Sequence, residues 1–402
     1  MHVDVCYRRH DTSMSPVEHR VTGKVPRFVM VGSAPSSGST LVADLLDSTP
    51  GYLCGPELGI FAIGEAYGNF AAAREWERAG RPFSVPAVYS QQRSFFNRKY
   101  LEVVGLTRAS YGVLLDRSDS LLEFAESISA RFAEVRGREC SVFCEKTPVN
   151  VNTASNFLMA FPEGRFIHVV RDGRSVVESL IRRKYSLYEA ALIWMSQVAC
   201  GVALASHPRV TTMRYEDLIE NPYQQILKCV GEERHGVTAK VVKDAFVRNE
   251  FRASLPRPRT WTFPRFDGVV HQHASPSTSL RRRHLDWLYS LELWNFGFQG
   301  RLGLLATFSD LQAALGYSEP IDRVNRFTVK DHLDYAQFAA KRPRVRLTSG
   351  LVVCVASDAL VREPLGPAQA PGEYWRPVPG RIAMPYWTRV QADGLMAVFG
   401  GS

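Results

Sequence analysis

The sequence lacks any long hydrophobic run. None of its 402 residues belongs to a stretch of about 18 apolar residues, the length needed to cross a bilayer as a helix. The first 20 residues, MHVDVCYRRHDTSMSPVEHR, also lack the apolar centre of a signal peptide. We therefore expect no membrane span and a cytoplasmic location.

Closely spaced cysteines are also scarce. The seven cysteines are scattered, and although Cys140 and Cys144 are four apart, no second pair completes a metal-binding set. We expect free thiols in a reducing compartment and no metal site.

Lysine and arginine together outnumber the acidic residues, and the formal net charge is +9. That charge favours anionic partners, although a general richness in arginine explains it equally well.

The order of apolar runs, polar turns and helical patterns indicates the fold class. RFVMVGS reads as a buried strand, and STLVADLLDS after it has the apolar spacing of a helix. Strand, polar turn and helix then recur at CSVFCEKTP, at RFIHVVRDGRSVVESLIRR and at RVTTMRYEDLIENP. This order predicts an α/β protein with a P-loop-type three-layer fold around a central parallel sheet. In such sheets ligands bind beyond the carboxyl ends of the strands.

The remaining segments suggest how the chain is divided. Residues 58–140 are mostly helical in pattern, and residues 255–283 are rich in Pro, Arg and Ser, which predicts a long loop. A helical pattern at 284–296 follows. We expect one domain over residues 25–317 and a small β-rich C-terminal extension of unknown role over 318–402.

The loop after the first strand, SAPSSGSTL, has the features of an anion-binding loop. A Walker loop would have a Lys at the place of Ser39, so hydrolysis of ATP or GTP is disfavoured. Gly38 permits close backbone approach, Ser37, Ser39 and Thr40 supply hydroxyls, and the next helix points its N–H groups at an anion. The alternative is a plain strand–turn–helix with a serine-rich cap.

This loop resembles the 5′-phosphosulfate loop of sulfotransferases that use 3′-phosphoadenosine 5′-phosphosulfate (PAPS). In that family the loop reads P-[KR]-S-G-T-T, and Ser36 here takes the place of the basic residue. The segment FIHVVRDGRSVVESLIRRK resembles the family's 3′-phosphate motif, which implies that Arg171, Ser179 and Arg183 bind that phosphate. An Arg fork and a Ser hydroxyl suit a phosphate chemically. An ion pair between Arg171 and Asp172 is the alternative.

Three further segments resemble the same family. FCEKTP implies that Lys146 approaches the sulfuryl group, the alternative being a solvated surface lysine. TMRYEDLIENP implies that Tyr215 packs near the adenine, although a structural tyrosine fits as well. SPSTSLRRR resembles a late loop that closes over the cofactor, which makes Arg281, Arg282 and Arg283 candidates; a solvated charge cluster is the alternative.

The candidate general base also comes from the resemblance. GYLCGPELGIF resembles the C-G-x-E segment of the tyrosylprotein branch, in which the Glu is the base; Glu57 holds that place and Glu65 is a nearby substitute. His168 lies in an apolar strand and is expected in the core. His271 and His273 lie in the long loop and are weaker candidates.

The resemblance covers about residues 25–317 and implies a PAPS-dependent sulfotransferase. It would move a sulfuryl group by in-line displacement to a hydroxyl of a small molecule or natural product, releasing PAP, with Glu57 as base. We expect no metal and no nucleic-acid partner, and leave a homodimer open. Two alternatives are a catalytically weak or inactive PAPS/PAP-binding relative, favoured by Ser36, and a P-loop kinase or NTPase.

Overall fold

The computed structural model describes residues 26–80, 96–230, 237–255, 288–289, 292–298 and 301–317, together with four short strand segments near the C-terminus. The centre of the molecule is a five-stranded sheet whose order is β2-β3-β1-β4-β5. All neighbouring strands in this sheet are parallel. The strands are β1 (Arg27–Ser33), β2 (Tyr52–Cys54), β3 (Val142–Lys146), β4 (Arg165–Val170) and β5 (Val210–Arg214).

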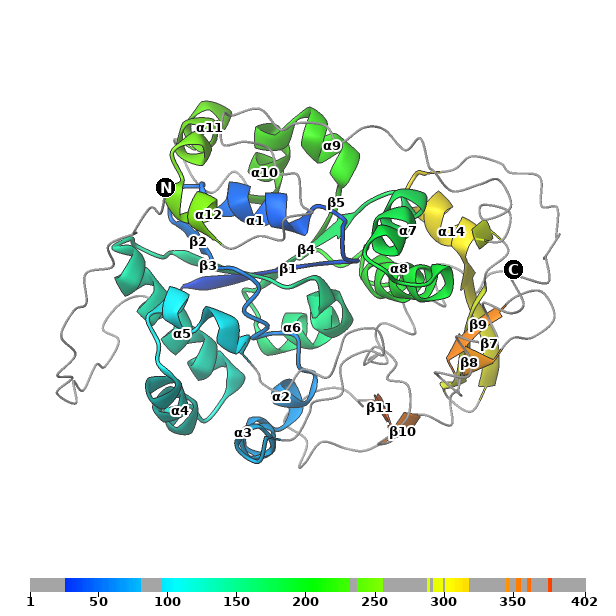
Figure 1. Cartoon of the computed structure of the whole chain (residues 1–402), viewed down its shortest axis with the longest axis horizontal. Helices are drawn as coiled ribbons and strands as arrows, with labels where there is room; N and C mark the ends of the chain where they lie inside the picture. Colours follow the sequence, from blue (N-terminus) through cyan, green and yellow to red (C-terminus); the bar gives the residue numbers. More distant parts are fainter. Residues whose placement is uncertain are drawn as a thin grey trace, which may run out of the picture.

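Helices cover both faces of the sheet, which makes three layers (Figure 1). Over one face lie α1 (Ser39–Asp47), α9 (Tyr215–Glu220), α10 (Pro222–Val230), α11 (Ala239–Val247) and α12 (Glu250–Ser254). The opposite layer contains α5 (Leu121–Arg136), the 3₁₀ helix η3 (Pro148–Thr153), α6 (Ala154–Ala160), α7 (Gly173–Arg182) and α8 (Leu187–Val202). The predicted α/β fold with a central parallel sheet is confirmed.

Alternation of apolar side chains along β1 explains how the sheet is buried on both faces. Phe28 and Met30 belong to one hydrophobic core, while Val29 and Val31 belong to the other. Successive strand residues point to opposite faces, so a strand covered on both faces must be apolar throughout. A Cβ atom on Gly32 would lie 2.5 Å from the backbone nitrogen of Val151. Glycine at this position therefore lets η3 cross β1 closely.

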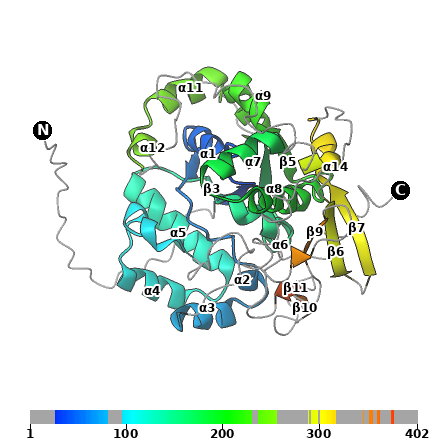
Figure 2. The ribbon, with the colours of Figure 1, turned by 45° about the vertical axis from the view of Figure 1, so that its right-hand side comes forward.

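The remaining helices between β2 and α5 lie beside the layer that contains α5. They are α2 (Glu65–Gly68), α3 (Phe70–Arg78), η1 (Arg98–Tyr100), η2 (Glu102–Val104) and α4 (Arg108–Arg117). Figure 2 shows α3, α4 and α5 together below the sheet, on the side opposite α9 and α11. Among the described residues, no helix has both the length and the apolar character needed to span a bilayer.

The chain beyond residue 287 differs from the sequence expectation. Residues 292–296 were expected in a helix, but they belong to β6 (Glu292–Phe298). This strand pairs antiparallel with β7 (Arg301–Thr307), which leads into α14 (Phe308–Ala314). The helix prediction is wrong there because the aromatic-rich segment has strand partners on both sides, and such pairing outweighs local periodicity.

Four short strands lie further along the chain. They are β8 (Val345–Arg346), β9 (Val352–Val355), β10 (Leu360–Arg362) and β11 (Trp375–Pro377). β9 lies beside β6, giving the order β7-β6-β9-β8, and β10 pairs with β11. Most of residues 318–402 lie outside the described residues, so the separate C-terminal extension stays a prediction.

Candidate functional site

The residues singled out from the sequence converge at one edge of the sheet. Each of the five strands has one of them at its last position or in the loop or helix that follows, and all five strands run in the same direction. Glu57 follows β2, Lys146 ends β3, Arg171 follows β4 and Tyr215 follows β5. Parallel strands bring these positions together with the loop after β1, as the sequence predicted.

We call residues 34–38, between β1 and α1, the anion loop. Its backbone is turned by two residues with left-handed conformations, Ser36 at φ 66° and Gly38 at φ 93°. Gly38 occupies the N-cap position of α1, and no side chain forms a cap hydrogen bond there. The first N–H groups of the nine-residue helix α1 therefore face the loop without a side-chain cap, which is the arrangement that attracts anions.

Two buried hydroxyl groups beside this helix end have no hydrogen-bond partner among the described residues. They belong to Ser33, which ends β1, and to Ser37 in the anion loop, at 0% and 1% exposure. A buried hydroxyl without a partner costs about 1–3 kcal/mol. With the uncapped start of α1, these two hydroxyls leave several hydrogen-bond donors of the described residues without a partner at this edge of the sheet.

Tyr215 and Arg171 pack directly against the anion loop. A Cβ atom on Gly38 would lie 2.3 Å from Cδ2 of Tyr215, so only glycine allows this contact. The guanidinium carbon of Arg171 lies 4.5 Å from the centroid of the Tyr215 ring, a cation–π distance. Burial, the main cause, raises the pKa of the Tyr215 hydroxyl, so the side chain stays neutral near pH 7. The segments after β4 and β5 thus form one wall of the site.

Two arginines reach Ser36, the position that departs from the sulfotransferase loop pattern. Nη1 of Arg171 donates to the Ser36 carbonyl oxygen at 3.0 Å. Nη1 of Arg183 lies 3.4 Å from the Ser36 hydroxyl oxygen. Both arginines come from the segment around α7. Positive charge therefore lies beside Ser36, although residue 36 itself has none.

The alternative role for Arg171, an ion pair with Asp172, is not what the structure shows. Asp172 is the N-cap of α7 and accepts from the backbone nitrogen of Arg174 at 2.9 Å and from its Nε at 3.0 Å. Ser179 lies half-buried on α7, and within the described residues its hydroxyl makes no hydrogen bond. Its carbonyl oxygen accepts from the backbone nitrogen of Arg183 at 3.3 Å. The structure thus places Arg171 and Arg183 on the anion loop, whereas the Ser179 side chain makes no hydrogen bond with it.

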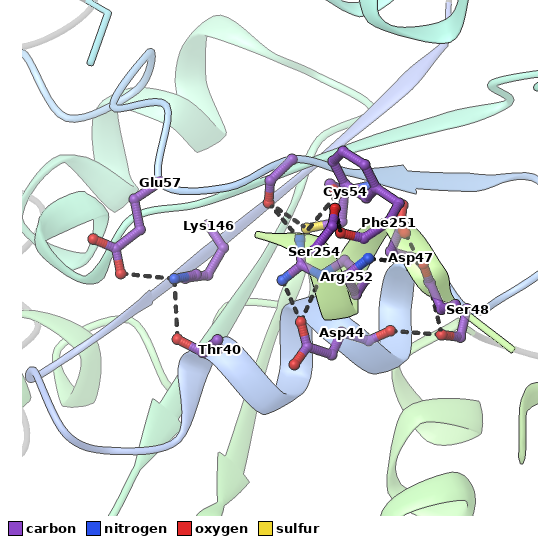
Figure 3. Close-up of polar contacts among 12 residues, drawn as sticks. Thr40, Asp44, Asp47, Ser48, Cys54, Glu57, Lys146, Phe251, Arg252 and Ser254 are labelled. Atoms are coloured by element: carbon purple, nitrogen blue, oxygen red, sulfur yellow. Dashed lines mark hydrogen bonds and ion pairs between the residues drawn. The ribbon is translucent and has the colours of Figure 1, made fainter. Parts of the chain in front are cut away.

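Lys146, Glu57 and Thr40 form a short chain of contacts (Figure 3). Nζ of Lys146 donates to Oε1 of Glu57 at 2.7 Å and to Oγ1 of Thr40 at 3.2 Å. The Lys146 side chain is 3% exposed, so the alternative of a solvated surface lysine is wrong. The Glu57 side chain is 35% exposed. Glu57 follows strand β2 rather than a helix, and it presents a carboxylate to solvent beside a buried ammonium group.

Sequence reasoning missed Glu145, the neighbour of Lys146. Its carboxylate is fully buried and accepts from the backbone nitrogen of Gly59 at 2.9 Å, from Thr147 Oγ1 at 2.6 Å and from Asn150 Nδ2 at 2.5 Å. Burial raises its pKa, the hydrogen bonds opposing that shift only in part. An acidic residue inside an apolar strand was the available signal. Its role is to hold the segment that follows Glu57.

The other candidate residues lie away from this edge or outside the described residues. His168 is buried as predicted, its ring stacked on Phe166 at 6.1 Å, and burial lowers its pKa to about 3. Glu65 begins α2, and its side chain is not described. Arg281, Arg282, Arg283, His271 and His273 lie outside the described residues.

The fold and the site define an α/β protein whose sheet edge carries an uncapped helix start and, beside it, an acid–ammonium pair. A model of the sulfotransferase family matches residues 26–230, which contain β1 to β5 and the contacts described above. The match covers half of the chain, and the chain belongs to the sulfotransferase family.

Curated relatives are similar over part of their length. Protein-tyrosine sulfotransferase 2 of Gallus gallus is 27% identical over 174 residues, 42% of this chain and 38% of the relative. Protein-tyrosine sulfotransferase 1 of Danio rerio is 25% identical over 202 residues, 50% of this chain and 44% of the relative. The chain thus spans less than half of either relative.

Among solved structures, the sulfotransferase domain from the Synechococcus PCC 7002 olefin synthase aligns with 80% of this chain and 97% of its own chain, at 16% identity and a TM-score of 0.40.

Proposed function

We propose that this protein transfers a sulfuryl group from PAPS to a hydroxyl group of an acceptor. The main support for the proposal is that an uncapped helix start and a lysine–glutamate pair lie at the same edge of the sheet. The uncapped start of α1, with the unpartnered hydroxyls of Ser33 and Ser37, suits an anion. The Lys146–Glu57 pair beside it suits the acid–base and electrostatic work of group transfer.

The residues of this edge fit PAPS. Ser36, Ser37, Gly38, Ser39 and Thr40 would surround the 5′ end through backbone N–H groups and hydroxyls. The left-handed turn at Gly38 and the unpartnered Ser37 hydroxyl support this placement. PAPS would supply an activated sulfuryl group whose leaving group is a phosphate, so the chain's residues need not create the activation themselves.

The segment around α7 would hold the 3′-phosphate, which is attached to the same ribose of PAPS as the 5′-phosphosulfate. Arg171, Ser179 and Arg183 would bind the 3′-phosphate, and Tyr215 would pack near the adenine. Both guanidinium groups already lie at the loop, on the Ser36 carbonyl and hydroxyl. An Arg fork gives a phosphate short, charge-assisted hydrogen bonds. Arg281, Arg282 and Arg283 would complete the cover of this site.

Glu57 would accept the proton of the acceptor hydroxyl. Its carboxylate is about one-third exposed, so an acceptor can reach it from solvent. Lys146 uses two of its three ammonium hydrogens on Glu57 and Thr40, which leaves one for an oxygen that gains negative charge. Because Thr40 lies in the first turn of α1, this lysine links the base to the anion loop.

In this proposal the acceptor presents a hydroxyl group to the Glu57 carboxylate. We infer a small molecule or natural product that carries a hydroxyl. The names of the curated relatives favour a second candidate, a phenolic hydroxyl such as that of tyrosine. A third reading, a relative that binds PAPS but transfers weakly, is favoured by Ser36, which supplies no charge of its own.

The test is transfer from PAPS labelled in its sulfuryl group. The protein would be incubated with labelled PAPS and a panel containing an aliphatic alcohol, a simple phenol, a tyrosine peptide and a sugar. We expect label on at least one acceptor class above the rate without protein. PAP binding without transfer to any class would support the weak relative instead. Absence of both binding and transfer would overturn the proposal.

A further inference from the structure

The segment that carries Glu57 is anchored by buried charged groups at both of its ends. We call residues 55–59 the base loop. It joins β2 to the irregular chain before α2 and lies in neither a helix nor a strand. A carboxylate on such a segment keeps its place only if the backbone around it is held.

Arg252 holds the first end of the base loop. Its Nη1 donates to the carbonyl oxygens of Cys54 at 3.2 Å and Gly55 at 2.9 Å. Its Nε donates to Oδ1 of Asp44 on α1 at 2.5 Å. The Arg252 side chain is 2% exposed, and Figure 3 shows it between α1 and the start of the base loop. One buried guanidinium group therefore links α12, α1 and the backbone two residues before Glu57.

Glu145 holds the second end. Its carboxylate and the hydroxyl of Thr147 both accept from the backbone nitrogen of Gly59, at 2.9 Å and 3.1 Å. The carbonyl oxygen of Leu58 accepts from the backbone nitrogen of Asn97 at 2.6 Å. Glu57 thus lies between two fixed points, and its own carboxylate meets Lys146 at 2.7 Å.

The contacts of Arg252 serve two separable purposes. A buried guanidinium group is costly unless it is paired, and the Asp44 carboxylate offsets that cost. The bonds to the Cys54 and Gly55 carbonyl oxygens add nothing to charge pairing, but they fix where the base loop begins. Arg252 also lies beyond residues 26–230, the part that the family model matches.

We propose that Arg252 is a positioning residue: by binding the Cys54 and Gly55 carbonyl oxygens, it keeps the Glu57 carboxylate beside Lys146. The inference rests on the proposed function of Glu57 as base. Loss of the two carbonyl bonds lets the loop shift while PAP binding at the anion loop persists. A misplacement of about 1 Å lowers the rate of a group-transfer step about 10²-fold.

Two variants of the full chain separate positioning from stability. Arg252→Lys keeps a positive charge for Asp44, but its single nitrogen cannot take the places of both Nε at Asp44 and Nη1 at the two carbonyl oxygens. Asp44→Asn weakens the ion pair but leaves Arg252 on the carbonyl oxygens. For each variant, hydrogen exchange of the amides in residues 54–59, the melting temperature, PAP affinity and kcat are measured.

The expected results differ between the two variants. For Arg252→Lys, exchange of residues 54–59 rises about tenfold or more, kcat falls about 10²-fold, and PAP affinity stays within about twofold. For Asp44→Asn, the melting temperature falls while exchange of residues 54–59 and kcat stay near the parent values. If Arg252→Lys does not fold, the double variant Arg252→Gln with Asp44→Asn is compared with Asp44→Asn alone.

Three outcomes would overturn the inference. In Arg252→Lys, hydrogen exchange of residues 54–59 could stay unchanged, or it could rise while kcat stays unchanged. In the third outcome, Asp44→Asn loses as much kcat as Arg252→Lys does. The exchange measurement needs no turnover. A parent protein with PAP binding but no transfer would therefore defeat the proposed function, while exchange alone still decides whether Arg252 holds the base loop.

Discussion

The anion loop and the base loop lie at the same sheet edge but are held in opposite ways. The anion loop, residues 34–38, is shaped by left-handed Ser36 and Gly38 and contains the unpartnered Ser37 hydroxyl. Its positive charge comes from arginines that follow β4. The base loop, residues 55–59, is tied at both ends to buried charges. One loop keeps a hydroxyl that has no partner among the described residues, and the other has its backbone bonded at both ends to buried side chains.

This contrast separates binding from chemistry. Changes at the anion loop should act first on PAP affinity. Changes at the base loop should act first on turnover and leave affinity nearly intact.

Glu57→Gln should have the largest effect, on turnover. The amide cannot accept the acceptor proton, so kcat should fall about 10²–10⁴-fold, the range of general-base catalysis. PAP affinity, measured by calorimetry, should stay within about twofold because Glu57 does not contact the anion loop. Glu65→Gln is the matched control and should retain turnover. Loss of turnover in Glu65→Gln with normal turnover in Glu57→Gln would move the base to Glu65.

Arg171→Ala should weaken PAP binding by about 2 kcal/mol, or roughly 30-fold, because a charge-assisted phosphate contact is lost. The control is Arg182→Ala, which also removes one positive charge, but from an exposed side chain of α7 that is paired with Glu178. Calorimetric titration with PAP compares the two. Equal PAP affinity in Arg171→Ala and the parent would show that the 3′-phosphate lies elsewhere.

Gly38→Ala should destabilise the anion loop by about 1–2 kcal/mol or more, because a Cβ atom is strained at its positive φ. That Cβ would also meet Tyr215 at 2.3 Å. Gly137→Ala is the control, since its φ is 55° and no atom lies within 4 Å of the added Cβ. Chemical denaturation measures both. A loss no larger than that of Gly137→Ala would mean that Tyr215 moves away freely.

Glu145→Gln should change the pH dependence of stability. Burial raises the pKa of the Glu145 carboxyl above its ordinary 4.5, so the folded state binds this proton more tightly than the unfolded state does. The unfolding free energy should therefore fall as pH rises from about 4.5 through the raised pKa of the folded state. The glutamine variant lacks this ionisation and should show a flatter profile. Denaturation at several pH values checks it, and parallel profiles would contradict it.

Local patterns in the sequence were sufficient to predict the sheet core and the anion loop. Apolar runs followed by polar turns marked β1, β3, β4 and β5, and the helical spacing marked α1. β2 was missed because three residues are too few for a periodic signal. β6 was misassigned because its partners, β7 and β9, decide its conformation, and β9 lies far along the chain.

The supports of the site were harder to predict than its candidate residues. Lys146 and Glu57 came from a family resemblance, but their 2.7 Å contact joins residues 89 positions apart. The Arg252 contact with Gly55 spans 197 positions. A buried arginine looks like a surface arginine in sequence, because its charge partner and its carbonyl contacts appear only when distant elements pack together.

The most direct measurement of the central claim is a calorimetric titration of the full chain with PAP and, separately, with ATP. We expect PAP to bind at least about tenfold more tightly than ATP. The reasons are the uncapped start of α1, the Ser33 and Ser37 hydroxyls and the two arginines at Ser36. Arg171→Ala should remove most of that preference. Tighter binding of ATP, or no binding of PAP, would contradict the account.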